Sequence, residues 1–438
     1  MQSRFCFRSI NRWQSKFGAR IIAVPAMFLV CALLVLSGCA SQSSPGTASG
    51  PGRRTPTTTA ISSPTPIIST LAPARSSTTK LPPLASLHMI DTSTGWALTR
   101  IPLYAIGGFI LRTTDGGQYW RNVSPAYATG LPHGEYDGGV ATMFLNASIA
   151  WVVTTRHRVY HTTDGGQTWQ ERQLKPPADS NDTAYITFSN AQDGWAVFNA
   201  SEVSAGEVYT IFRTIDGGNN WTFVSQSGKG ASQLPNGYED WALGFLNAST
   251  GWAGGGYSNL ALSPFYITHD GGTTWKQQSL PLLVSKPTAK LSILPPTFFS
   301  TSDGLLPVLF FVNAHDNGLV LYATHDSGTT WNQSKPLEAD IYQSGLTIET
   351  LAALSLVNMQ TTWIATNNGT PLYTTSDGGQ HWISIAAPTG TKIEQVSFIS
   401  SDVGWAIDRP DFYTSSILKT TDGGRTWTEV FHTSQPQP

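Results

Sequence analysis

Seven aspartates are the most regularly recurring polar residues of this chain, and each lies in the same short sequence motif. The octapeptide Thr-Thr-Asp-Gly-Gly-Gln-Tyr-Trp at 113–120 returns six times with its Asp, second Gly and Trp unchanged. The seven aspartates are Asp115, Asp164, Asp216, Asp270, Asp326, Asp377 and Asp422. The octapeptides lack the spaced carboxylates and closing Glu of a calcium loop. We expect no metal there, and a structural role in which each Asp accepts hydrogen bonds from amides of a glycine turn.

Other carboxylates lie between the repeats and are better placed for acid–base chemistry. Glycoside hydrolysis needs two carboxyl groups about 5–10 Å apart on either side of a sugar. The candidates are Glu135, Asp137, Glu202, Glu207, Glu239, Asp240, Asp408 and Asp411. The sequence does not say which of these converge, so a glycoside hydrolase stays open as an alternative function.

Basic and aromatic residues between the repeats are candidates for a binding face. The arginines there are Arg100, Arg156, Arg158 and Arg409. Glu239-Asp240-Trp241 adds two acids and the one tryptophan after residue 38 that falls outside the repeated positions. Aromatic side chains beside charges can anchor a sugar or a protein partner. Core packing is the other interpretation of Trp241.

Several kinds of chemistry have no support in the sequence. The histidines form no spaced ligand pair, and there is no glycine-rich phosphate loop, nucleophile elbow or catalytic cysteine. We therefore expect no metal and no cofactor. A formal charge of -2 for 438 residues gives no indication of a basic nucleic-acid surface, and we expect no nucleic-acid partner.

The N-terminus has the pattern of a targeting segment. Residues 1–20 carry five basic residues and no acid, and residues 21–36 are almost wholly apolar. The segment ends in Leu36-Ser37-Gly38-Cys39, which resembles the lipobox of bacterial lipoproteins. This predicts a signal peptide over 1–38 and a lipid on Cys39 that anchors the chain to the outside of a bacterial cell membrane. An uncleaved transmembrane anchor is the alternative, although 16 apolar residues fall short of the ~20 needed to span.

Residues 39–80 consist mainly of Ser, Thr, Pro, Gly and Ala, with no aromatic residue. Such a composition buries too little apolar surface to offset the loss of chain entropy on folding. We expect a disordered tether that holds the following domain away from the bilayer.

The rest of the chain must position the candidate residues, and it is built from a repeat. The tryptophans that close the octapeptides are 45 to 56 residues apart, a period typical of propeller blades. Before each octapeptide an apolar residue is followed seven positions later by Trp, as in Phe188/Trp195, except that Phe298 pairs with Leu305. Alternating apolar residues and turns predict four strands a unit, such as 393–399, 404–407, 416–420 and 426–431 in the last. No stretch has a helical period, so we predict an all-β fold: one seven-bladed β-propeller over residues 81–438.

The octapeptide resembles the Asp-box, or bacterial neuraminidase repeat. With the Gly-Trp-Ala element, the units over residues 84–432 resemble the photosystem II stability and assembly factor family. That resemblance implies a non-enzymatic binding platform whose Asp-boxes lie on the turn between the third and fourth strands at one face. Partner contacts then lie on the opposite face, where arginines contribute in that family. Here 17 basic residues stand against 28 acidic ones after residue 80, which argues against a broad basic patch.

Two enzyme families also carry Asp-boxes. Sialidases use an Arg-Ile-Pro motif and three arginines that grip a carboxylate. Arg100-Ile101-Pro102 matches the tripeptide, but it follows a second-strand tryptophan, and no arginine occurs between Arg213 and Arg409. Xyloglucan hydrolases resembling this repeat use two facing propellers, whereas this chain has one. We therefore predict a monomeric platform for an unidentified protein or glycan, with a single-propeller glycoside hydrolase as the alternative.

Overall fold

The structure is a computed structural model that divides the chain into two units, Met1–Ser62 and Ser63–Pro438. The first unit lies outside the described residues, so everything below concerns the second. The described residues are 67–68, 70–72, 78–79, 81–100, 108–125, 139–154, 156–176, 184–202, 206–230, 233–236, 241–256, 265–281, 283, 285–286, 288–313, 315–339, 341, 353–366, 369 and 371–434.

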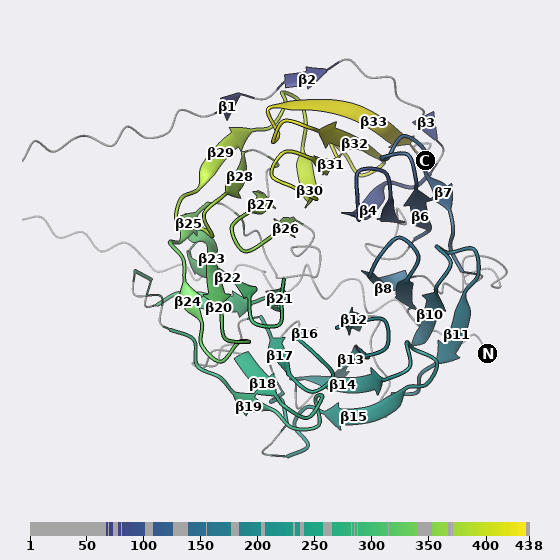
Figure 1. Ribbon diagram of the computed structural model, residues 1–438, viewed down its shortest axis with the longest axis vertical. Helices are drawn as coiled ribbons and strands as arrows, with labels where there is room; N and C mark the ends of the chain where they lie inside the picture. The colour runs from purple at the N-terminus through teal and green to yellow at the C-terminus, as the bar shows by residue number, and fades with distance from the viewer. Residues whose placement is uncertain are drawn as a thin grey trace, which may run out of the picture. The chain divides into compact units, whose positions relative to one another are not determined.

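Seven antiparallel sheets follow one another around a ring, as Figure 1 shows, and they confirm the predicted all-β propeller. Blade 1 holds β4 (Leu84–Met89), β5 (Gly95–Thr99), β6 (Ile110–Thr113) and β7 (Arg121–Asn122). Blade 2 holds β8 (Gly139–Phe144), β9 (Ala150–Thr154), β10 (Arg158–Thr162) and β11 (Gln170–Gln173). Blade 3 holds β12 (Ala184–Phe188), β13 (Gly194–Glu202), β14 (Gly206–Thr214) and β15 (Thr222–Gln226). Blade 4 holds β16 (Ala242–Phe245), β17 (Gly251–Gly254), β18 (Phe265–Thr268) and β19 (Lys276–Gln277).

The last three blades carry additional strands. Blade 5 holds β20 (Lys290–Ile293), β21 (Thr297–Phe298), β22 (Gly304–Asn313), β23 (Asp316–Thr324), β24 (Asn332–Gln333) and β25 (Leu337–Glu338). Blade 6 holds β26 (Leu354–Leu356), β27 (Thr362–Ala365), β28 (Leu372–Thr375) and β29 (Ile383–Ala386), with β1 (Ile67–Ile68) added outside β29. Blade 7 holds β30 (Ile393–Phe398), β31 (Gly404–Asp408), β32 (Thr414–Thr420) and β33 (Thr426–Ser434), with β2 (Thr70–Ala72) and β3 (Thr78–Thr79) outside β33.

The four strands predicted for the last unit are confirmed as β30 to β33, each within three residues of its expected ends. The added strands β1 to β3 lie within residues 39–80, which the composition assigns to a tether. The tether itself stays a prediction, and the folded unit begins no later than Ile67.

Each Gly-Trp element serves two blades at once. A Cβ on Gly194 would lie 2.2 Å from the ring of Phe188 in the same blade, so glycine leaves room for that ring. Trp195 then stacks on Phe245 of the following blade, with ring centroids 3.4 Å apart. The repeated apolar residue and tryptophan therefore form the contact between neighbouring blades as well as the core of each blade.

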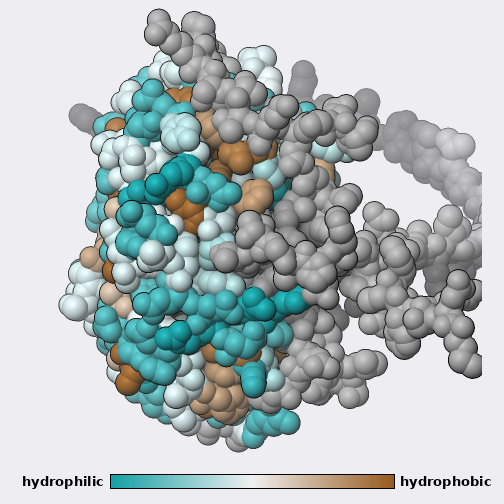
Figure 2. Space-filling model, turned by 90° about the vertical axis from the view of Figure 1, so that its right-hand side faces the viewer, coloured by the Kyte–Doolittle hydropathy of each residue, from teal (hydrophilic) through white to brown (hydrophobic). Residues whose placement is uncertain are grey.

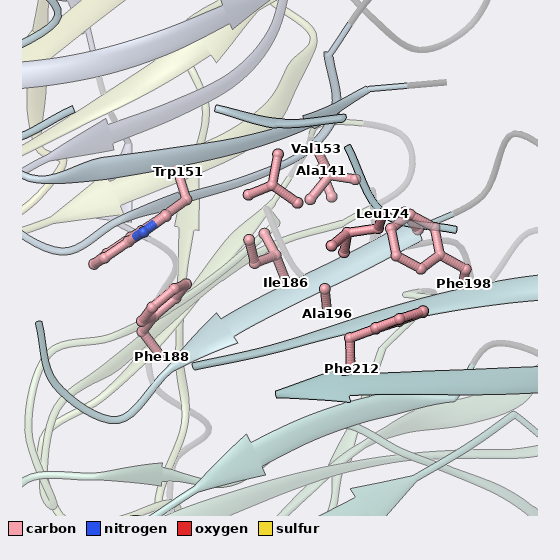
Figure 3. Packing of buried hydrophobic residues seen from close by; sticks show 11 residues of the cluster. Ala141, Trp151, Val153, Leu174, Ile186, Phe188, Ala196, Phe198 and Phe212 are labelled. Carbon is pink, nitrogen blue, oxygen red and sulfur yellow. The ribbon is translucent and has the colours of Figure 1, made fainter. Parts of the chain in front are cut away.

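The hydrophobic core consists of clusters between adjacent blades. Figure 3 shows the cluster between blades 2 and 3, where Trp151 faces Phe188 and where Ile186 and Ala196 lie between the two sheets. Trp151 is fully buried and Phe188 is 5% exposed. Because no blade can bury its two faces alone, the ring depends on every such contact.

The ring closes by direct packing of blade 7 against blade 1. Leu84 N donates to Ser415 Oγ at 2.9 Å, and Met89 N donates to Ser397 Oγ at 2.9 Å. All four strands of the blade 7 meander, β30 to β33, come from one continuous segment. None of these four strands is therefore supplied by the N-terminal part of the chain.

Candidate functional site

The seven repeated aspartates lie in turns between the third and fourth strands of the blades. We call these the box turns: residues 113–120, 162–169, 214–221, 268–275, 324–331, 375–382 and 420–427. In the second, Asp164 Oδ1 accepts from Thr162 Oγ1 at 2.8 Å and from Thr168 N at 2.9 Å. Asp164 Oδ2 accepts from Thr168 Oγ1 at 2.6 Å. The other six aspartates bond in the same way to the threonine two residues before and the amide four residues after.

In the second box turn these bonds hold the carboxylate of Asp164 in its charged form. Hydrogen bonds from the hydroxyl and the amide of Thr168 lower the pKa of Asp164 to about 2, from an ordinary 3.8. A carboxylate that is occupied on both oxygens by its own turn has little capacity left to transfer a proton. Each box turn therefore holds its own aspartate by hydrogen bonds from within the turn.

The four candidate arginines lie on the face opposite the box turns. Arg100 follows β5, Arg156 and Arg158 flank the turn between β9 and β10, and Arg409 follows β31. Each position lies in the connection between a second and a third strand or at its edge, whereas the box turns connect the third strand to the fourth. We call this second side the loop face.

The turn between β9 and β10 has an uncommon backbone conformation. His157 stands between Arg156 and Arg158 and has a φ of 58°, in the left-handed region that non-glycine residues rarely adopt. Its N–H donates to Thr154 O at 3.0 Å, and its carbonyl accepts from Leu174 N at 2.9 Å. Its ring lies edge-on to Phe198 of blade 3, 5.1 Å away. Backbone strain of this kind is held by the surrounding contacts and concentrates at functional sites.

The two arginines of this turn have different surroundings. Arg158 Nε lies 3.6 Å from Glu171 Oε1, and Glu171 Oε2 accepts from the hydroxyl of Tyr160 at 3.1 Å. Arg156 contributes its carbonyl to Gln173 Nε2 at 2.8 Å, and its side chain is half-buried. Both arginines were predicted from the sequence as candidates for the binding face, whereas His157 was not. The signal for it was the Arg-His-Arg triplet in so short a hairpin.

Arg409 is more deeply buried than a surface-binding residue. It is 5% exposed and forms an ion pair with Glu394 of β30, which also pairs with Lys392 Nζ at 3.2 Å. Its backbone N donates to Lys392 O at 2.9 Å. This pair ties the loop after β31 to the innermost strand of blade 7, so Arg409 acts inside the fold.

Trp241 takes the core position that the sequence left as the other interpretation. It is 3% exposed, belongs to the cluster between blades 3 and 4, and lies edge-on to Tyr266 at 5.6 Å. Its neighbours Glu239 and Asp240 lie outside the described residues, as does Cys39. Trp241 therefore contributes packing and offers no exposed ring.

Of the candidate catalytic acids, two have described side chains, Asp408 and Asp411. Burial raises the pKa of Asp408, whose Oδ1 accepts from Lys392 N at 2.6 Å. Burial also acts to raise the pKa of Asp411, but bonds from Tyr413 and Thr414 outweigh it and the pKa is lowered. In the part of the chain that the structure describes, no three His, Cys, Asp or Glu side chains gather to hold a metal ion. Nor do these residues include a helix long and apolar enough to cross a membrane.

The described surface on one side of the ring is mixed in character. Figure 2 looks at the rim from the side of blades 1 and 2, where hydrophilic residues predominate and hydrophobic ones form small separate groups. The exposed large hydrophobic residues are correspondingly scattered: Tyr119, Ile215, Phe223, Phe299, Ile383 and Phe412. Single exposed hydrophobic residues are normal on a folded protein.

Comparison with known proteins confirms the resemblance that the repeat indicates. The family model described as photosynthesis system II assembly factor YCF48 matches residues 138–235, which cover blades 2 and 3. The photosystem II assembly lipoprotein Ycf48 of Synechococcus sp. (strain CC9902) is 25% identical over 197 residues, 39% of this chain and 56% of that protein. The chain thus matches little more than half the length of this curated relative.

Two solved structures are similar to this chain at low identity. A structure of YCF48 bound to D1 peptide has a TM-score of 0.48 and 20% identity, covering 78% of this chain and 95% of that one. The GH74 xyloglucanase from Xanthomonas campestris has a TM-score of 0.43 and 11% identity, covering 79% of this chain and 60% of that one.

Proposed function

We propose that this chain is an extracytoplasmic, lipid-anchored platform that binds a protein segment on its loop face without catalysing a reaction. The observation that carries the proposal is the turn at Arg156, His157 and Arg158. It lies within the 98 residues that match the assembly-factor family, and it combines two arginines with a strained backbone. The family and the curated relative are both named for assembly, and we extend that role to this chain as part of the proposal.

The chemistry of the turn favours an acidic protein segment as ligand. Arg158 is already close to Glu171, and a second carboxylate can share an arginine because the guanidinium carries five donors in a planar fork. The β9–β10 hairpin is held by bonds on both sides of His157, which keeps the ordering cost of binding low. The box turns on the other side act as support in this proposal.

The anchor rests on the lipobox-like residues before Cys39 and on the word lipoprotein in the name of the relative. Mass spectrometry of the N-terminal peptide should find a diacylglycerol-modified Cys39. Cys39→Ser should move the protein from the membrane to the soluble fraction. An unmodified Cys39 in a membrane-bound chain would instead support the uncleaved anchor.

The platform is tested by cross-linking and affinity capture with the full chain in its own membrane. We expect one stoichiometric protein partner, whose recovery falls at least tenfold in Arg156→Gln/Arg158→Gln. Arg425→Gln is the matched control, because this exposed arginine lies in the box turn of blade 7. Equal recovery with both variants would remove the loop face from the proposal. Sugar release that a single acid-to-amide change abolishes would replace the platform with the glycoside hydrolase.

A further inference from the structure

Hydrogen bonds from tryptophan tie most neighbouring blades together. At four of the seven contacts between blades, the second-strand tryptophan donates its indole N–H to a backbone carbonyl of the next blade, a bond that we call the indole latch. The latches are Trp405 to Gly116 O (2.9 Å), Trp96 to Asn146 O (3.0 Å), Trp151 to Gly217 O (2.8 Å) and Trp195 to Gly271 O (2.9 Å). They join blades 7, 1, 2, 3 and 4 in one continuous series.

The next contact uses an indirect latch. Trp252 of blade 4 donates to Gln278 Oε1 at 2.9 Å, and Gln278 Nε2 donates to Gly328 O in the box turn of blade 5 at 2.8 Å. The side chain of Gln278 thus carries the connection from one blade to the next.

The contact between blades 6 and 7 has the ring without the latch. Trp363 stacks on Phe398 of blade 7 with centroids 3.9 Å apart and planes within 1°. The ring is 2% exposed, yet its Nε1 reaches no hydrogen-bond partner among the described residues. A buried donor without an acceptor is unfavourable, so this contact is weaker than its equivalents.

The strands β1, β2 and β3 cross the outside of this same contact. Ile67 and Ile68 pair in parallel with Ile385 and Ala386 at the outer edge of blade 6. Thr70 to Ala72 then pair in parallel with Thr426 to Thr428 at the outer edge of blade 7. Figure 1 shows β1 beside β29 and β2 beside β33, on the outside of the ring. One residue separates β1 from β2, so a single short segment is bonded to both blades.

The same segment continues along blade 7 toward blade 1. Thr78 and Thr79 pair with His432 and Thr433 of β33. Thr433 Oγ1 lies 2.9 Å from Ser415 Oγ, the oxygen that accepts from Leu84 N at the start of blade 1. The three strands therefore follow the ring from blade 6 to the first residue of blade 1.

We propose that β1, β2 and β3 form a strap that joins blades 6 and 7 in place of the missing indole latch. The strap supplies backbone hydrogen bonds to two sheet edges, and these do not require an acceptor for Trp363. It also covers edges that would otherwise be open to pairing with another chain. Release of the strap leaves a folded ring whose outer strands in blades 6 and 7 are loosened.

The test is hydrogen exchange on the full chain with Leu71→Pro/Ala72→Pro. Two adjacent prolines are needed because only alternate residues of a parallel strand donate to a given neighbour, and proline removes the donor. We expect amide exchange to rise at least tenfold in β29 and β33 and to stay at parent rates in blades 1 to 4. Ser62→Pro/Ser63→Pro is the control and should match the parent.

A synthetic peptide covering residues 67–79 provides the second measurement if the proline variant folds poorly. Added to that variant, the peptide should slow exchange in β29 and β33, whereas a peptide of scrambled order should not. Parent-like exchange in both strands of the variant, or an equal rise in all seven blades, would overturn the strap.

Discussion

The contact between blades 2 and 3 and the contact between blades 5 and 6 occupy equivalent places in the ring but use different chemistry. Between blades 2 and 3, Trp151 stacks on Phe188 at 3.5 Å and donates to Gly217 O. Between blades 5 and 6, the corresponding repeat positions are Leu305 and Leu356, and leucines and isoleucines dominate the cluster. That contact has no second-strand indole and hence no latch.

This difference separates two functions of the repeated tryptophan. Leucines bury apolar area without a preferred direction, while a stacked aromatic pair adds about 0.5–1.5 kcal/mol beyond its area and fixes the orientation of both rings. The hydrogen bond from the indole N–H then fixes the position of one blade relative to the next. Where both residues are leucine, these two positions contribute buried apolar area to the contact between the blades and no hydrogen bond.

The largest effect is expected from truncating the stacked ring. Trp151→Ala should lower the free energy of unfolding by about 4 kcal/mol, through a large cavity and the loss of the bond to Gly217 O. Leu305→Ala should cost about 3 kcal/mol, because the cavity is smaller and no acceptor is left behind. Urea denaturation of both variants measures the difference. Equal losses would mean that the latch adds nothing to burial.

Converting the leucine contact is the second way to test the comparison. Leu305→Trp alone should destabilise by about 1–3 kcal/mol, because the fully buried site of Leu305 has no room for an indole. Adding Leu356→Phe should recover part of the loss, with a coupling energy of about 1 kcal/mol in a double-mutant cycle. A coupling energy of zero would show that the two positions do not form a pair.

The latch itself is tested by exchanging tryptophan for phenylalanine at two places. Trp195→Phe breaks a bond to Gly271 O, whereas Trp363→Phe removes a donor that has no partner among the described residues. Both changes lose a similar amount of ring. Trp195→Phe should therefore be more destabilising by about 1 kcal/mol in matched denaturation curves. A larger loss for Trp363→Phe would contradict the assignment.

The smallest effect concerns pH and the box turn of blade 2. The folded pKa of Asp164 is about 2, below its ordinary 3.8, so its stabilising contribution is complete above about pH 4. It is lost as the pH falls through 4 toward 2. Asp164→Asn should lower stability at pH 7 and make the urea midpoint depend less on pH between 4 and 2. An unchanged pH dependence would show that this carboxylate contributes nothing.

Much of the fold was predictable because the repeated sequence marks both the strands and the turns between them. Alternating apolar residues and glycine turns defined the strands of the last unit, and the Phe188/Trp195 spacing placed both residues in the core. Burial of single side chains outside the repeat was not predictable. Arg409 lies against Glu394, 15 positions earlier, and Trp241 lies against Tyr266 in the same blade, and neither partner is marked by a pattern.

The strap was also beyond sequence analysis, for a different reason. Its pairing uses backbone groups, which every residue but proline offers equally, and residues 67–79 have no alternation that marks a strand. His157 was missed because a left-handed φ depends on the hairpin that encloses it.

The four-stranded meander of each blade is built from one uninterrupted stretch of chain, and this affects how the number of blades in such a ring can change. Duplication or deletion of one repeat in the gene adds or removes a whole blade, and no sheet is left half built. New chain ends can likewise be introduced between any two blades by circular permutation. The exception is the stretch from blade 6 to blade 1. There β1 to β3, which precede blade 1 in the chain, pair with blades 6 and 7, so new chain ends would separate them from blade 1 or from their partner strands.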